Sequence, residues 1–190
     1  MTTTTPVTET NLTYEQYLKE PVTMLRYDIV DGEVIMSAAP NIYHQTISGN
    51  INEPVRRFVR ENKLGRVWYA PVDIIVQQEP LRTRQPDLLF ISNSRAAIIL
   101  EGRVHGGPDL VVEILSPSNS RADIESKLAD YARIGVRECW MISPEGGTVE
   151  TLQLYAGEWK RLAIRGVGEN VETVVLQELE LPVLEIFQGV

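Results

Sequence analysis

The sequence is poor in the residues that build disulfide frameworks and zinc centres. It holds one cysteine, Cys139, and two histidines in 190 residues. A single cysteine excludes a disulfide within the chain, and no spacing of Cys or His suits a zinc site. This usage suits a reducing compartment, so we expect a cytoplasmic protein. The chain also lacks a signal-peptide pattern and any apolar run that could cross a bilayer, so no membrane contact is expected.

Positive charge is scarce as well. Lys and Arg number 18 against 26 Asp and Glu, which gives a net charge of −8. Strong non-specific binding of nucleic acid depends on neutralising phosphates with lysine and arginine. A nucleic-acid enzyme with this balance needs a local basic patch, or a metal ion that supplies positive charge. The length suits one globular domain, which we place at residues 12–190, behind a disordered, Thr-rich lead-in at residues 1–11.

Helical and strand periodicities alternate along the chain. Thr13 and Gln16 predict a capping box at the first helix, and Asp31-Gly32 predicts a type I′ turn in a hairpin. Gly65 is expected to end the second helix, and residues 78–84 read as a polar connection. The expected elements are helix 14–19, the hairpin around Asp31-Gly32, helix 41–63, strands 67–69, 72–77 and 87–91, a short helix and Gly-rich loop within 93–108, strand 109–116, helix 121–134, and strands 138–143, 148–155, 159–165, 172–176 and 183–187.

The run Asp109–Ser116, DLVVEILS, is apolar on both faces, which is typical of a central strand in a sheet covered on both sides. This strand, helix 121–134 and strand 138–143 form a βαβ pattern, which predicts a parallel strand pair. We therefore predict an α/β (α+β) fold. Its mixed β-sheet is flanked by helices and extended by C-terminal β-hairpins.

Two acidic residues belong to strands that are otherwise apolar on both faces. Glu113 lies inside strand 109–116, and Asp87 opens strand 87–91. An ionised carboxylate in a core strand costs several kcal/mol, as an order of magnitude, unless it is paired or binds a metal. A hard cation such as Mg²⁺ (or Mn²⁺) between the two would relieve their repulsion, with the carbonyl of Ile114 as third ligand. Alternatively, Asp87 caps its strand and Glu113 pairs with an arginine.

Three more side chains are candidates for the same site. Lys127 falls on the inward stripe of helix 121–134, where it can pair with Glu113 or hold a metal-bound water. The alternative is a lysine whose stem covers apolar surface while its ammonium group reaches water. His44 is a candidate proton shuttle or simply a polar residue of a helix start. Glu33, the first residue after the Asp-Gly turn, is a less specific candidate.

Basic residues gather in two places. They are Arg56, Arg57, Arg60 and Lys63 on helix 41–63, and Arg82 and Arg84 before Asp87. Such a set is usually a solvated face, but it is also the best candidate for contacts to phosphates.

Together these residues resemble a known pattern. Gln85-Pro86-Asp87 followed by Glu113 resembles the signature of the PD-(D/E)XK nuclease superfamily, which has the restriction-endonuclease-like fold. In that superfamily both acids bind Mg²⁺, and a lysine two residues after the second acid assists the attacking water. Position 115 is Leu115 here. Over roughly residues 13–185 the chain resembles the Uma-type family of bacterial endonucleases, in RYDIVDGEVIMSAAPNIYHQ, YAPVDI, QPDLLFIS, GGPDLVVEILSPSNSRAD, KLADYARIGVRECWMISPE and TVETLQLY.

The resemblance implies a Mg²⁺-dependent endonuclease that hydrolyses phosphodiester bonds of nucleic acid, with DNA as the expected substrate. In the Uma-type family the lysine stands on the following helix, at the place of Lys127. Asp87 and Glu113 would hold the metal, and Glu33 and His44 would complete the site. Small nucleases of this kind often pair, so we expect a homodimer through edge strands. Rival readings are hydrolysis of RNA or another phosphodiester, and a catalytically silent binding or assembly protein, which the acidic balance favours.

Overall fold

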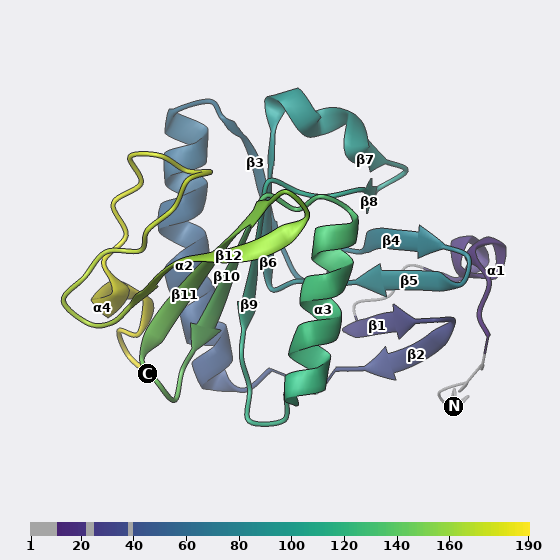
Figure 1. The fold of residues 1–190 in the computed structure, drawn as a ribbon, viewed down its shortest axis with the longest axis horizontal. Coiled ribbons are helices and arrows are strands. Elements are labelled where there is room, and N and C mark those ends of the chain that lie inside the picture. The colour runs from purple at the N-terminus through teal and green to yellow at the C-terminus, as the bar shows by residue number, and fades with distance from the viewer. Residues whose placement is uncertain (1–10, 22–24, 38–39) are drawn as a thin grey trace.

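A computed structural model of the chain describes residues 11–21, 25–37 and 40–190 (Figure 1). The lead-in predicted at residues 1–11 lies, apart from Asn11, outside the described residues. None of the helices in these ranges has the length and apolar character needed to span a bilayer. The helices are α1 (Tyr14–Lys19), α2 (Ile42–Glu61), the 3-10 helix η1 (Asn93–Ile98), α3 (Arg121–Arg133) and α4 (Val183–Ile186).

Six strands form the central sheet, in the order β12-β11-β10-β9-β6-β3. The strands β9 and β10 are parallel neighbours in the sheet, and helix α3 connects them along the chain. The predicted βαβ unit is therefore confirmed. All five residues of β9 are buried, as expected for a central strand. The bounds are β3 (Gly65–Tyr69), β6 (Leu88–Ser92), β9 (Leu110–Ile114), β10 (Glu138–Ser143), β11 (Thr148–Tyr155) and β12 (Glu158–Arg165).

Helices α2 and α3 cover opposite faces of the central sheet, on either side of β9 in Figure 1. On one face, Val112 of β9 belongs to the same buried cluster as Ile51 of α2. On the other face, Val111 packs in a second cluster with Tyr131 of α3. Because side chains alternate along a strand, Glu113 points to the α3 face. The predicted fold class, a mixed sheet flanked by helices, is confirmed.

A second sheet has the order β2-β1-β5-β4-β8-β7. Its strands are β1 (Tyr27–Val30), β2 (Glu33–Met36), β4 (Ile74–Gln78), β5 (Leu81–Arg84), β7 (Ile99–Leu100) and β8 (Arg103–His105). Asp31 and Gly32 join β1 to β2 with φ of 53° and 83°. Two positive φ angles are what a type I′ turn requires, so the predicted hairpin is confirmed.

Strand β5 corrects the expectation of a polar connection at residues 78–84. Leu81 and Thr83 are buried on one side of it. Arg82 and Arg84 extend from the other side to Asp130 on α3. The two arginines made the segment look like a solvated loop, whereas their charges are compensated by a carboxylate on a helix distant in sequence.

The C-terminal segment was also predicted wrongly in part. Residues 183–187 were expected as a strand and instead form helix α4. Residues 172–176 form no strand, because the backbone N–H groups of Val174 and Val175 donate to the Glu138 carboxylate at 2.8 and 2.9 Å. The hairpin β11–β12 is the C-terminal extension that the sequence correctly predicted.

Gly65 does not end α2, which stops at Glu61 and is followed by Lys63 with φ of 54°. Gly65 is the first residue of β3. A Cβ atom there would overlap the carbonyl oxygen of Ile91 on β6. The glycine is therefore required by the close approach of two strands.

Candidate active site

The register of β6 and β9 brings the two acidic residues together. The strands are antiparallel with Leu88 opposite Val112, so Asp87, which precedes β6, lies across from Glu113. The Asp87 N–H donates to the Val112 carbonyl at 3.0 Å. The Ile114 N–H donates to Asp87 Oδ2 at 2.7 Å. Asp87, Glu113 and Ile114 all line one cavity of about 590 Å³, which we call the Asp87–Glu113 cavity.

Two nitrogen atoms lie against the other oxygen of Asp87. Arg26 Nη1 is 2.7 Å and His44 Nε2 is 3.2 Å from Asp87 Oδ1. Burial alone would raise the pKa of Asp87, but the His44 hydrogen bond, the Arg26 charge and the Ile114 N–H hold it below its ordinary value. Asp87 is therefore a carboxylate at neutral pH. Its Oδ1 atom is buried and contacts these two nitrogens, but it has no well-aligned hydrogen bond from the described residues.

Glu113 is held from helix α3. Lys127 Nζ lies 2.6 Å from Glu113 Oε2, and the Tyr131 hydroxyl donates to Oε1. Burial raises the pKa of Glu113, and the nearby Asp87 charge adds to this rise, while Lys127 and Tyr131 oppose it. For Lys127, burial works to lower the pKa, but the charges of Glu113, Asp28 and Asp87 raise it above its ordinary value. Lys127 is therefore an ammonium ion at neutral pH.

A buried ion-pair network next to the cavity holds helix α3, and with it Lys127, in place. Arg84 Nη1 lies 3.0 Å from Asp28 Oδ2, and Arg84 Nε donates to Asp130 Oδ2 at 2.7 Å. Ser126 of α3 accepts a third hydrogen bond from Arg84 at 2.7 Å. These contacts tie β1 and β5 to α3, the helix that carries Lys127. The sequence reasoning missed Arg26, Asp28 and Asp130 as parts of the site. The charged residues within strand patterns were the available signal.

Other predicted site residues lie elsewhere. Glu33 is exposed on β2 and does not line the Asp87–Glu113 cavity, whereas His44 does. The six basic residues do not form one patch. Arg56, Arg57 and Arg60 are exposed on the second half of α2, and Lys63 is exposed just after the helix ends. Arg82 and Arg84 bond to acidic residues. From His44 to Arg56 the helix runs twelve residues, about 18 Å. The basic residues that face the cavity are Arg26, Arg84 and Lys127.

The oxygen atoms at this cavity fit a hard divalent cation. Within the described ranges, no three His, Cys, Asp or Glu side chains gather as a metal site. Two carboxylates and the Ile114 carbonyl are a small set, but Mg²⁺ usually keeps several waters and needs few protein ligands. Asp87 Oδ1 has no well-aligned hydrogen bond from the described residues, so a cation at this oxygen would compete only with the Arg26 and His44 contacts. An all-oxygen set suits Mg²⁺ or Mn²⁺ better than zinc or copper, for which nitrogen and sulfur ligands are usual.

Comparison with known proteins agrees with the fold. No curated protein matches the chain. A crystal structure of a putative nuclease belonging to DUF820 from Anabaena variabilis superposes with a TM-score of 0.75. The two sequences are 20% identical, and the match covers 93% of this chain and 97% of the other, which shows a shared fold. The model of the family Uma2, described as "Putative restriction endonuclease", matches residues 14–184. Because this match spans most of the sequence, the chain belongs to the Uma2 family.

Proposed function

We propose that this chain is a metal-dependent endonuclease that hydrolyses phosphodiester bonds of nucleic acid, with Mg²⁺ (or Mn²⁺) as cofactor and DNA as substrate. One observation carries the proposal: Asp87, Glu113 and Lys127 meet at a single cavity, from two antiparallel strands and the following helix. Asp87, Glu113 and the Ile114 carbonyl would hold the ion. When bound, such an ion polarises a phosphate and lowers the pKa of a water molecule.

The charges of the cavity favour a phosphate only when a cation is present. The charged side chains that line the cavity are three cations and four carboxylates, so without a metal the set carries one net negative charge: Arg26, Arg84, Lys127, and Asp28, Asp87, Glu113, Asp123. A divalent ion gives the set a net positive charge, which attracts the phosphodiester. This resolves the difficulty of an acidic protein that acts on a polyanion.

Lys127 is a donor in this mechanism and not a base. Its raised pKa keeps the ammonium group protonated, so it can orient the attacking water or stabilise charge on the phosphate oxygens. His44 lines the same cavity and bonds to Asp87, which suits the proton-shuttle role proposed for it. Glu33 does not line the cavity, and we assign it no step.

A cleavage assay tests the proposal. Purified protein with Mg²⁺ or Mn²⁺ is expected to cut plasmid or linear DNA, and a chelator is expected to stop it. Asp87→Asn and Glu113→Gln should each abolish cutting, because each removes a metal ligand. Glu180→Gln is the matched control, since Glu180 is exposed and does not line the cavity. Cutting that survives both site substitutions would refute the assignment. RNA in the same panel tests the substrate class.

A catalytically silent binding or assembly protein is the second candidate. The observation in its favour is that Lys127 and Arg26 already pair with both carboxylates. Titration calorimetry with Mg²⁺ separates the two: no heat of binding in the native chain would favour the silent protein. The homodimer also stays a prediction, and sedimentation velocity tests it.

A further inference from the structure

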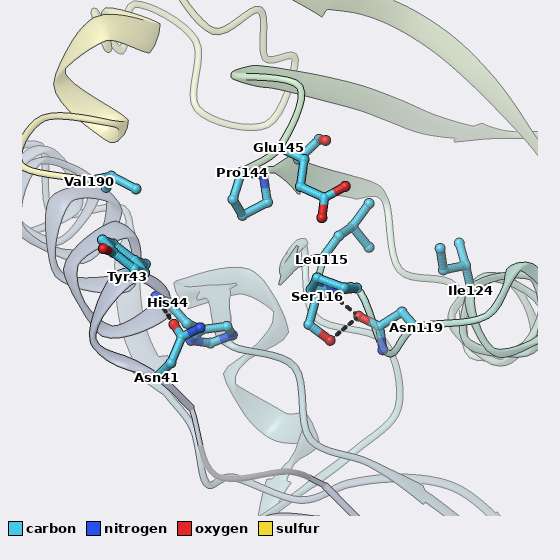
Figure 2. A pocket seen from close by; sticks show the side chains of 12 residues that line it. Asn41, Tyr43, His44, Leu115, Ser116, Asn119, Ile124, Pro144, Glu145 and Val190 are labelled. Carbon is cyan, nitrogen blue, oxygen red and sulfur yellow. Dashed lines mark hydrogen bonds between the residues drawn. The ribbon is translucent and has the colours of Figure 1, made fainter.

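A second hollow, of about 630 Å³, opens beside the Asp87–Glu113 cavity. Figure 2 shows it between the start of α2 and the loop that leads into α3, below the turn between β10 and β11. We call it the side pocket. Asn41, His44, Ser116 and Asn119 line both hollows. The two hollows therefore adjoin, and a group in the side pocket would lie near a phosphate bound in the cavity.

The walls of the side pocket differ from those of the cavity. They are mainly apolar, with Tyr43, Leu115, Pro117, Ile124, Pro144 and Val190. Among the described residues, neither Lys nor Arg lines this pocket, and its one acidic side chain is that of Glu145. A phosphate therefore has no cation to meet there. The walls suit a neutral group with apolar faces and N–H donors at its edge.

We propose that the side pocket binds a nucleobase of the substrate strand, beside the phosphodiester in the cavity. The inference rests on the proposed function, because the base reaches this pocket through the sugar attached to that phosphate. A base that is stacked and paired in a duplex cannot enter a hollow of this kind. The substrate is therefore a single strand, or a duplex from which one base is turned out.

Tyr43 supplies an aromatic face for such a base. It lies in the first turn of α2 and lines the side pocket, and the residue is 55% exposed, so it is open to a ligand. Bases of any identity stack on tyrosine, which contributes about 1–3 kcal/mol per base. Leu115 lines the same pocket. The apolar residue at the position of the superfamily's lysine thus belongs to the wall of this pocket.

Polar groups lie on two walls of the pocket. The Asn119 amide oxygen accepts hydrogen bonds from the N–H and Oγ of Ser116 at 2.8 and 3.2 Å (Figure 2). This fixes the amide and leaves its nitrogen as a donor for a base carbonyl. Glu145, in the β10–β11 turn, is an acceptor for exocyclic amino groups, which cytosine, adenine and guanine carry and thymine lacks.

Binding is measured by fluorescence anisotropy with Mg²⁺ present in the Lys127→Met background, which keeps both carboxylate ligands of the metal and is expected to cut slowly. The probes are a labelled single-stranded DNA, the same strand with abasic sites, and its duplex. We expect the base-bearing single strand to bind about tenfold more tightly than either of the others. Adding Tyr43→Ala should weaken its binding about tenfold, because stacking is lost. Tyr155→Ala is the matched control, an exposed tyrosine at the other end of β11, and should change nothing.

Base identity gives an independent readout. Glu145→Gln should reduce the preference for oligo-dC over oligo-dT, whereas Tyr43→Ala should weaken both. Equal affinity for abasic and base-bearing strands, or no binding of either strand, would refute the proposal that the side pocket binds a nucleobase. Cleavage by the native chain is scored separately. If the protein cuts DNA but binds abasic and base-bearing strands equally, the endonuclease proposal is supported and the base-binding proposal is refuted. If binding depends on the base but no DNA is cut, the base-binding proposal is supported and the endonuclease proposal is refuted.

Discussion

Replacing Lys127 by Met keeps the length of the side chain and removes its charge. Its Nζ lies 2.6 Å from Glu113 Oε2, where Glu113 is 5% exposed. Removing one partner of a buried ion pair typically costs about 3–5 kcal/mol. Here the Lys127 side chain is 20% exposed, and Tyr131 still donates to Glu113. We therefore expect the free energy of unfolding at neutral pH to fall by about 2 kcal/mol.

The loss should depend on pH in a defined direction. Burial already raises the pKa of Glu113, and without the opposing Lys127 charge it rises further. The native state then holds the Glu113 proton to a higher pH than the unfolded chain does. For such a group, stability is fully present below the unfolded pKa, near the ordinary value of 4.5, and is lost as pH rises through the native pKa. Lys127→Met should thus cost little below that value and most near neutrality.

Urea denaturation followed by circular dichroism at several pH values measures this effect. The double variant Glu113→Gln/Lys127→Met removes both charges and should lie within about 1 kcal/mol of the native chain. Nuclease activity should fall about a hundredfold or more in Lys127→Met. Lys160→Met is the matched control: Lys160 also lies 2.6 Å from a glutamate, Glu158, but that pair is exposed and should contribute nothing measurable. A Lys127→Met protein as stable as the native chain at neutral pH would refute the reasoning.

Three further predictions concern the site and its support. Asp87→Asn should abolish the heat of Mg²⁺ binding in calorimetry, and an unchanged titration would remove Asp87 from the metal site. Arg84→Gln should lower the free energy of unfolding by about 3–5 kcal/mol, because it leaves the buried Asp28 carboxylate without its cation and leaves Asp130 paired with Arg82 alone. Gly65→Ala should cost about 1–3 kcal/mol, since the added methyl overlaps the Ile91 carbonyl. Gly49→Ala, in open space on α2, is its control and should raise stability by about 0.5–1 kcal/mol in thermal melts.

Features set by neighbouring residues were predictable from the sequence. The capping box of α1 needs only Thr13 and Gln16, and the β1–β2 hairpin needs only Asp31-Gly32. The strand–helix–strand pattern of β9, α3 and β10 also predicts a parallel strand pair, because short crossovers of this kind are almost always right-handed and join neighbouring strands. The inward stripe of α3 placed Lys127 toward the sheet, where it meets Glu113.

The errors share one cause. Residues 78–84 and 183–187 were misassigned because contacts far away in sequence decide their conformation. The two arginines of β5 bond to Asp130, and no local pattern reports that partner. The two groups of basic residues lie apart for the same reason. Helix α2 packs on the central sheet, whereas β5 belongs to the second sheet.

The sequence by itself determined which side chains face the interior of their own elements, because strand and helix periods are local properties. It thereby selected Asp87, Glu113 and Lys127. Only the tertiary structure decided which groups meet them. Arg26 and His44 reach Asp87 from segments before β1 and at the start of α2. The antiparallel register of β6 and β9 sets Asp87 opposite Glu113. Such register arises from the packing of the whole sheet between α2 and α3, and it leaves no mark on the spacing of neighbouring residues.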